Sequence, residues 1–406
     1  MANFLLPIVA LAVVVVLLLP SVRNAILWRA TVTPLASIIG SGFLISGPLL
    51  THIAGSLAPV AMLMVLLAAY RIGAVIRFNI KYAEPLLVNL APTSVIAIAQ
   101  KISDLALGFA YVVSVAFYIR LLAAFLMRFS DGREPILESA LTTVVLLFIA
   151  TVGWLRGLGG LEKLEETAVA IKLAIIAALV IGLIGFDIQW LSRGEGLVNI
   201  DLKISVGDRF RLLAGLLLIV QGFETSRYLG KGYDGSIRIR SMQLAQIIST
   251  AIYMLFVVLG LPLLMEFHGA ADETIIIVLA GRVAAVMSVL LLVAAVMSQF
   301  SAAVADTVGA GGLFNELSGN RISDKVGYTF LIVVAIVLVW TANVFEIVTL
   351  ASRVFAIYYL LQCLVAIAAC SNYRKGSISY YHWRIAAYIS TALVLILVIV
   401  FAKPVG

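Results

Sequence analysis

The stretch VTPLASIIGSGFLISGPLLTHIA, residues 32–54, is mainly apolar and carries Gly40-Ser41-Gly42 near its middle. A run of this length can cross the hydrocarbon core of a bilayer, which takes about 20 residues of helix. Pro34 and Pro48 flank the glycines, and glycine and proline both weaken a helix interior. The stretch therefore predicts a membrane-spanning helix that is interrupted half way across.

The rest of the chain has the same apolar character. Of its 406 residues, 63% are hydrophobic and 12% are charged, and the mean hydropathy is +1.13. Soluble domains contain about 45–50% apolar and about 25% charged residues. We therefore predict an all-α polytopic protein of the cell membrane, with the lipid bilayer as its surroundings. A soluble enzyme, a disordered chain and a disulfide-rich secreted domain are excluded.

Apolar runs that are broken by proline, glycine and charge predict about twelve membrane spans. The expected spans are 3–20, 32–54, 57–78, 96–127, 136–155, 167–186, 210–230, 242–265, 274–310, 326–342, 346–370 and 383–402. We interpret the first as a retained helix and not as a signal peptide. No positive side chain precedes it and no small-x-small cleavage site follows it.

The net charge of +7 is explained by the loops and needs no nucleic-acid partner. Basic residues collect in the cytoplasmic loops of membrane proteins. Two, four and four predicted spans separate successive basic loops, so all of these loops lie on one side, which we assign to the cytoplasm. The four loops contain Arg23 and Arg29; Arg71, Arg77 and Lys81; Arg227, Lys231, Arg238 and Arg240; and Arg374, Lys375 and Arg384.

Ten of the spans divide into two sets of five. An odd number of spans per half gives the two halves opposite topology, which is typical of inverted-repeat transporters. The predicted parts are an extra N-terminal helix with a cytoplasmic linker (1–31), a first five-helix repeat (32–186), an external connector (187–209), a second repeat (210–370) and a C-terminal helix (371–406).

A second interruption lies at the corresponding place in the second half, in Val220-Gln221-Gly222-Phe223-Glu224-Thr225-Ser226. A lone Gly-Ser-Gly in a membrane helix more often serves close helix packing. Interruptions at corresponding positions of two repeats instead indicate a transport site, because freed backbone groups are tolerated only where they line a cavity or bind something. The amide end of a half-helix favours an anion and its carbonyl end a cation.

The two interruptions resemble the unwound motifs of the amino acid–polyamine–organocation superfamily. Further similar stretches are Tyr82-Ala83-Glu84 and Ile171-Lys172-Leu173, and the resemblance covers about residues 32–400. It implies the leucine-transporter fold, with ten core helices in two inverted repeats and a discontinuous first and sixth core helix.

The resemblance also implies a substrate site at the two interruptions. Amides around Ser41 and Gly42 would hold a substrate carboxylate, and carbonyls near Ile219, Val220 and Gly222 would hold its ammonium group. Lys172 matches the lysine that stands in place of a sodium ion in sodium-independent members. The complete set of expected substrate-binding residues is Ile39, Gly40, Ser41, Gly42, Phe43, Ile219, Val220, Gly222, Phe223 and Glu224.

The sequence also departs from the family pattern. Leu218, Ile219 and Val220 stand where the family has aromatic residues, one of which closes over the substrate. The usual Ser-Arg pair of the eighth core helix is absent, and Asp306-Thr307 lies near its place. An extra helix precedes the core. These differences concern the substrate more than the fold.

Three ionisable residues inside apolar runs are candidates for proton coupling, because charges at membrane depth are costly. They are Lys172, Asp306 and Glu224. Lys172 would release its proton more readily in a dry site than in water, or would only snorkel to the surface. We hypothesise that it approaches Asp306 in one conformational state. Glu224 would pair with Arg227, carry a proton or face a cationic substrate.

These features predict a secondary active transporter of an amino acid or related small organic amine, which works by alternating access and is proton-coupled. The alternatives are a carrier of an inorganic ion or organic anion with the same fold, and a non-transporting membrane sensor. An enzyme is not expected, since no nucleophile–base arrangement is found. No cofactor or resident metal is expected, because the three histidines and two cysteines form no metal-binding pattern.

Overall fold

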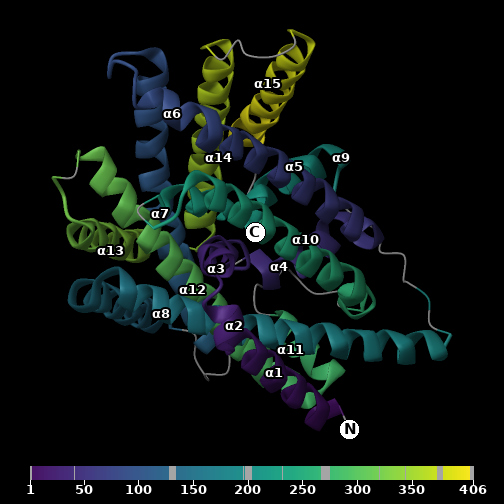
Figure 1. The fold of residues 1–406 in the computed structure, drawn as a ribbon. Helices are drawn as coiled ribbons and strands as arrows, with labels where there is room; N and C mark the ends of the chain where they lie inside the picture. Colours follow the sequence, from purple (N-terminus) through teal and green to yellow (C-terminus); the bar gives the residue numbers. More distant parts are fainter. Residues whose placement is uncertain are drawn as a thin grey trace.

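The computed structural model describes residues 2–40, 42–127, 134–194, 196, 204–230, 232–266, 275–319, 321–342, 344–372 and 378–402. Helices make up nearly all of this described part (Figure 1). The α-helices are α1 (Ala2–Leu18), α2 (Pro20–Arg23), α3 (Ile26–Ile38), α4 (Gly42–Ala54), α5 (Ala58–Phe78), α6 (Glu84–Leu87), α7 (Val95–Leu126), α8 (Pro135–Ser192), α9 (Val206–Gly215), α10 (Gly235–Met265), α11 (Ile275–Val283), α12 (Ala285–Leu317), α13 (Asp324–Thr341), α14 (Val344–Asn372) and α15 (Ile378–Phe401).

Shorter helical elements connect these helices in the described part of the chain. They are the 3₁₀ helices η1 (Gly55–Leu57), η4 (Leu216–Val220) and η5 (Phe223–Tyr228), and the π-helical turn η2 (Asn79–Ala83). Such turns commonly mark helix ends and functional sites. Here the second predicted interruption, residues 220–226, begins at the last residue of η4 and includes the first four residues of η5. The η2 turn joins α5 directly to α6.

Nine helical segments of the described part are long and apolar enough to cross a membrane. Their outer faces are apolar as well: Leu67, Phe109 and Leu155, for example, are 56%, 45% and 74% exposed. Apolar surface on this scale is typical of a lipid-facing protein. The chain is therefore a multi-pass membrane protein, as the composition predicted. The count of twelve spans stays a prediction.

Two predicted spans, 136–155 and 167–186, are parts of one long helical element, α8. It changes direction at Gly157, whose φ of 59° and ψ of −156° are not helical. Glycine tolerates this backbone conformation because it has no Cβ. The residues between the two spans are helical up to and after that point, so the connection is a bend and not a loop.

The predicted span 274–310 is wrong as one continuous helix. The structure contains two helices there, α11 and α12, separated at Ala284, which has an extended backbone (φ −162°, ψ 141°). The Ser288 side chain donates to the Ile277 carbonyl oxygen at 2.8 Å and holds the two helices together. Hydropathy alone did not reveal this break, because the residues on both sides of it are apolar.

The interrupted helices lie near the centre of the bundle. Figure 1 shows α3 and α4 among α8, α10 and α12, and α3 contacts each of these three helices. On the outside, α1 packs against α8 and α15 packs against α14. Of the predicted external connector 187–209, residues 187–192 continue α8, and 195 and 197–203 lie outside the described residues. The division into two five-helix repeats stays a prediction.

Candidate functional site

The first interruption separates α3 from α4. α3 ends at Ile38, and Ile39 leaves the helical conformation (φ −84°, ψ 44°) before α4 begins at Gly42. Ser41 lies outside the described residues. Because the last carbonyl groups of a helix have no partner within it, the end of α3 presents several buried oxygen atoms that must be satisfied from elsewhere.

Lys172 of α8 satisfies part of this carbonyl end. Its side chain is fully buried, and Nζ donates to the carbonyl oxygens of Ala36 and Ile39, both at 2.8 Å, and to Ser301 Oγ at 2.9 Å. An ammonium group has three donors, and all three are used. A positive charge thus sits at the negative end of a half-helix, where it is favoured.

Two hydroxyl groups bind the remaining carbonyls of the first interruption. Ser298 Oγ of α12 lies between the carbonyl oxygens of Ile39 and Gly40. Tyr253 Oη of α10 is 2.9 Å from the Ile38 carbonyl oxygen and 2.8 Å from that of Ile219, and shares its one proton between them. Tyr253 therefore connects the first interruption to the second, and Ile219, an expected ammonium ligand, already has a donor.

The second interruption is centred on Gly222, at φ 113° and ψ −14°. A Cβ at this position would lie 2.3 Å from Ser37 Oγ, so both the backbone conformation and the space require glycine. A Cβ at Gly42 would likewise lie 2.4 Å from the Ile219 carbonyl oxygen. Two expected site glycines therefore allow the two interruptions to touch.

Aromatic rings pack around the junction. Phe43 is buried, meets the Tyr253 ring edge-on at a centroid distance of 5.6 Å and also packs on Phe256 at 4.6 Å. Phe223 stacks on Tyr359 at 5.5 Å. Both expected site phenylalanines are therefore packed against partners in this state, and Val220 is buried among apolar residues too.

Glu224 follows the second interruption and is completely buried. Its Oε2 accepts a hydrogen bond from the Gly222 N–H at 2.9 Å and one from Tyr359 Oη at 2.8 Å. Its Oε1 has no hydrogen-bond partner among the described residues. The expected pairing of Glu224 with Arg227 is not present within the described structure. The short η5 helix aims the two side chains at different partners.

Other buried polar atoms near the interruptions are also unsatisfied within the described structure. They are Tyr111 Oη, Gln221 Oε1 and both amide atoms of Gln299. A buried polar atom without a partner costs free energy, and such atoms in a protein usually meet a water, an ion or a ligand. These atoms therefore mark the junction of the interruptions as a candidate ligand-binding region.

Asp306 of α12 binds a different part of the first interruption. Its Oδ1 accepts from Ser37 Oγ at 2.9 Å, and its Oδ2 accepts from Ser114 Oγ of α7. No hydrogen bond or ion pair joins Asp306 to Lys172 within the described residues. The two candidates hold α3 separately here, and their approach in another state stays a prediction.

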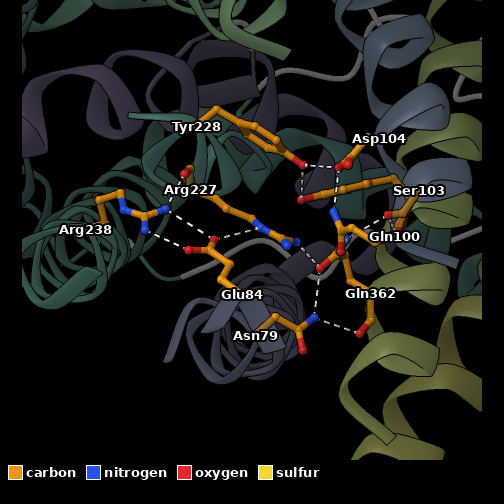
Figure 2. Close-up of polar contacts among 10 residues, drawn as sticks. Asn79, Glu84, Gln100, Ser103, Asp104, Arg227, Tyr228, Arg238 and Gln362 are labelled. Carbon is orange, nitrogen blue, oxygen red and sulfur yellow. Dashed lines mark hydrogen bonds and ion pairs between the residues drawn. The ribbon is translucent and has the colours of Figure 1, made fainter. Parts of the chain in front are cut away.

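A polar network includes Arg227 near the end of η5 (Figure 2). Arg227 binds Glu84 at 3.2 Å and Gln362 Oε1, and Arg238 binds the other oxygen of Glu84 at 2.7 Å. Gln362 in turn accepts from Asn79 Nδ2 at 2.8 Å. We call Glu84, Arg227, Arg238, Gln362 and Asn79 the Glu84 network. It ties α6 and η2 to η5, α10 and α14, on the side that the basic loops assign to the cytoplasm.

Sequence reasoning did not single out Ser37, Ser114 or Tyr253 as site residues. Serines are common in membrane helices, and a lone tyrosine in an apolar run has no distinctive spacing. Their roles depend on contacts between helices far apart in the sequence, such as the 215 residues between Tyr253 and Ile38. Glu84 did carry a signal, the Tyr82-Ala83-Glu84 stretch, although its arginine partners were not foreseen.

The fold and the paired interruptions define a multi-pass membrane transporter of the leucine-transporter fold. The family model described as "APC superfamily transporter" matches residues 20–402. The chain therefore belongs to this superfamily, as the resemblance predicted. An uncharacterized protein of Aquifex aeolicus (strain VF5) is 44% identical over 351 residues, which are 86% of this chain and 85% of that protein.

Solved structures share the fold at low sequence identity. MhsT in complex with L-phenylalanine has a TM-score of 0.59 at 14% identity, and the match covers 92% of this chain and 98% of MhsT. A mutant of the Eremococcus coleocola manganese transporter gives 0.58 at 12%, covering 92% and 86%. A Na⁺-coupled sialic acid symporter in an outward-open state gives 0.56 at 13%, covering 100% and 98%. These likenesses support the fold alone.

Proposed function

We propose that this transporter moves an amino acid or a related small organic amine across the membrane and couples the movement to protons. The substrate would bind at the junction of the two interruptions, where buried polar atoms have no partner in the described structure. Movement of α3 and η5 would open the site first to one side of the membrane and then to the other.

The observation that carries the proton coupling is the position of Lys172. Its ammonium group occupies a shell of two carbonyl oxygens and a hydroxyl at 2.8–2.9 Å, which is the kind of oxygen shell that otherwise suits a metal cation. Lys172 would hold the end of α3 while it is protonated and would release that end when it loses the proton. Loss of the proton removes a cation from the carbonyl end of the half-helix and weakens its attachment to α8.

The region around Glu224 supports an amine as substrate. Glu224 Oε1, Gln221 Oε1 and Tyr111 Oη are buried oxygen atoms without a partner in the described structure. An ammonium group donates three hydrogen bonds and carries a positive charge that a buried carboxylate favours. Among the solved neighbours, MhsT is seen with L-phenylalanine, and the other two are named for manganese and sialic acid.

The Glu84 network would act as a gate on the cytoplasmic side. Arg227 is 5% exposed and bridges Glu84 to Gln362. The network would therefore close the substrate path between the interruptions and the cytoplasm in this state. Opening would require Arg227 to leave both partners. Water that enters with the opening would solvate the separated charges and offset the cost of breaking a buried pair.

The test is uptake of a radiolabelled amino-acid mixture into proteoliposomes that contain the purified protein. An inward proton gradient is compared with a sodium gradient of equal size. Accumulation with the proton gradient alone is the expected result. Accumulation with sodium alone would contradict the proton coupling. Accumulation with neither would favour the ion or organic-anion carrier, to be followed with labelled divalent metal and carboxylate mixtures.

A pair of variants tests the coupling residues. Replacement of Lys172 by alanine and of Asp306 by asparagine should each lower proton-driven uptake and remove its dependence on pH, because each removes a charge that holds α3. If both variants keep the pH dependence of the unmodified protein, neither residue takes part in coupling.

A further inference from the structure

Glu165 of α8 is a buried carboxyl group that the proposed mechanism does not yet use. Its side chain is 1% exposed, and neither carboxyl oxygen has a hydrogen-bond partner among the described residues. A carboxylate buried without partners is costly, and the cost falls when the group holds a proton. The Thr33 side chain of α3 is the hydrogen-bonding group that acts on this carboxyl. Glu165 is therefore a site where protonation can change with little disturbance of existing bonds.

A cavity of about 420 Å³ lies beside Glu165. It is bounded by α2, α3, α8 and the segment after η5, on the side that the basic loops assign to the cytoplasm. Glu165 is part of its wall, together with Thr33 and Tyr233. A space of this size holds several water molecules, so protons can reach the wall from the aqueous side.

Glu165 and Lys172 lie on one face of α8. They are seven residues apart, which is about two helical turns and about 10.5 Å along the axis. Between them lies a small apolar layer made of Val32, Ala36, Val169 and Ala305, with Trp28 and Leu173 packed against it. This layer separates the cavity wall from the Lys172 ammonium group in the present state.

The same stretch of α3 contributes to the cavity wall and to the binding of Lys172. Val32 and Thr33 line the cavity, and the Ala36 carbonyl oxygen, one turn further on, accepts from Lys172. A shift of α3 would therefore remove Val32 and Ala36 from the apolar layer and loosen a Lys172 hydrogen bond in one movement. Opening the layer and freeing the lysine are mechanically linked.

The charged and titratable groups around Glu165 come from every element packed against it. Arg23 is already paired with Glu166 at 2.8 Å. Lys172 and Asp306 lie within electrostatic reach of Glu165. The groups that face the cavity or act on Glu165 are Arg23 of α2, Arg29 of α3, Glu162, Lys163, Glu166 and Lys172 of α8, Asp306 of α12, and Tyr233.

We propose that Glu165 is a second proton-binding site, through which Lys172 exchanges its proton with the cytoplasmic cavity. Glu165 first gives its own proton to water in the cavity and becomes a carboxylate. When α3 moves and water enters the layer, an N–H bond of the Lys172 ammonium then breaks and an O–H bond forms on Glu165. Lys172 becomes a neutral amine and Glu165 a neutral acid, which then gives its proton to water in the cavity. This step rests on the proton coupling proposed above.

The first test needs no transport substrate. Infrared spectra of the reconstituted protein are recorded across a pH titration for the unmodified protein, E165Q, E162Q and K172M. Glu162 lies on the same helix and lines the same cavity, so E162Q is the matched control. The expected result is a carboxylic-acid C=O band that E162Q keeps and E165Q lacks. Its titration midpoint moves to higher pH in K172M, because a nearby cation is lost.

Because the buried carboxyl groups of Asp306 and Glu224 can give bands of their own, the comparison is the difference between the E165Q spectrum and that of the unmodified protein. An E165Q spectrum from which no band is missing, or a midpoint that K172M leaves in place, would overturn the proposal. Folding is checked by size-exclusion profile, and E165D, which keeps a carboxyl group, serves if E165Q does not fold. E165D should retain the band.

The second test separates this proposal from the proposed function. In proteoliposomes, E165Q should lower proton-driven net uptake of the labelled amino-acid mixture about tenfold or more, as loss of a proton-transfer group does. Exchange of labelled for unlabelled amino acids should stay unchanged, because exchange does not require release of the proton. Equal loss of both activities would show a structural role and contradict the proposal. Absence of uptake in the unmodified protein would contradict the amino-acid function and leave the infrared result standing.

Discussion

The two interruptions of the bundle solve the same backbone problem in different ways. At the first, side chains from three helices satisfy the freed carbonyls: Lys172 from α8, Tyr253 from α10 and Ser298 from α12. At the second, the Gly222 amide is satisfied by Glu224, and Glu224 Oε1 and Gln221 Oε1 are left without partners in the described structure. The carbonyl groups of the first interruption are bonded by the protein's own side chains. The second interruption keeps buried hydrogen-bond acceptors that a ligand can use.

This difference assigns different roles to the two interruptions. Groups that are fully bonded hold the half-helix in place, and they act only when a bond such as that of Lys172 is given up. Buried acceptors without partners are available to an incoming ligand. We therefore expect changes to the bonded side chains of the first interruption to alter coupling and stability, and changes to the unpartnered side chains of the second to alter substrate affinity. Gly222 is different, because its backbone holds the two interruptions in contact.

The largest effect is expected for Gly222→Ala. The added Cβ would lie 2.3 Å from Ser37 Oγ, and a φ of 113° costs a non-glycine residue about 1–3 kcal/mol before that clash is counted. Folded protein, measured by size-exclusion chromatography, should be almost lost. Gly232→Ala is the control, since its nearest atom would be 3.9 Å away. Normal folding of G222A would mean that the interruptions do not need this close contact.

Replacement of Lys172 by methionine should abolish proton-driven uptake but leave a folded protein. Methionine has a similar length and removes the charge, so the carbonyls of Ala36 and Ile39 lose their donor. Uptake is measured in proteoliposomes and should fall to the level of empty liposomes. Lys101→Met, at an exposed position on α7, should behave like the unmodified protein. Undiminished proton-driven uptake by K172M would contradict a role of the first interruption in coupling.

Glu224→Gln should act on the substrate instead. The glutamine oxygen still accepts from the Gly222 N–H, but the negative charge is lost. The KM for an amine substrate should rise about tenfold with little change in maximal rate, because a charge-assisted hydrogen bond is replaced by a weaker neutral one. The measurement is uptake against substrate concentration. An unchanged KM would contradict the ligand-binding role of the second interruption.

Tyr253→Phe should lower stability with a smaller effect on transport. The hydroxyl serves the carbonyls of Ile38 and Ile219, and its removal leaves a buried carbonyl unsatisfied at a cost of about 1–3 kcal/mol. The melting temperature in detergent should fall. Tyr70→Phe, at a residue 38% exposed, is the matched control and should melt as the unmodified protein does. An unchanged melting temperature for Y253F would show that the two carbonyls do not depend on this hydroxyl.

The smallest effect is expected outside both interruptions, at the N-cap of α10. Asp234 is exposed, and its Oδ1 accepts from the Ile237 N–H at 2.8 Å, which holds the pKa of this carboxyl below its usual range. Because the native pKa is lowered, the stabilisation is present at neutral pH and is lost as the pH falls through that value. The melting temperature of Asp234→Ala should be slightly lower than that of the unmodified protein at pH 7. In acid the two proteins should have the same melting temperature. A constant difference at all pH values would contradict this.

Much of the fold followed from the order of residues along the chain. Runs of about 20 apolar residues have few alternatives to crossing a bilayer as helices, because backbone groups in lipid must be satisfied within the helix. The interruption at Gly40 and the one at Gly222 were both visible as glycine-containing motifs. The break at Ala284 was not, because alanine favours a helix and only the contacts between α11 and α12 decide otherwise.

The site was predicted less completely than the fold. Lys172, Asp306 and Glu224 stood out because a charge within an apolar run is costly wherever it points. Their partners did not, since serine, tyrosine and glutamine are neutral and give no such signal. Arg227 illustrates the limit: its spacing suggested Glu224, three residues away, whereas tertiary packing gave it Glu84, 143 residues away.

Composition and neighbours along the chain were enough to place this protein in a membrane, to locate the interruptions at Gly40 and Gly222, and to single out the buried charges. Which oxygen each charge binds depended on the folded arrangement. Tyr253 reaches both interruptions, Lys172 occupies the end of α3, and Glu165 has no partner in the described structure beside its cavity. Hydrogen bonds act over about 3 Å, so only the folded arrangement of distant helices determines them.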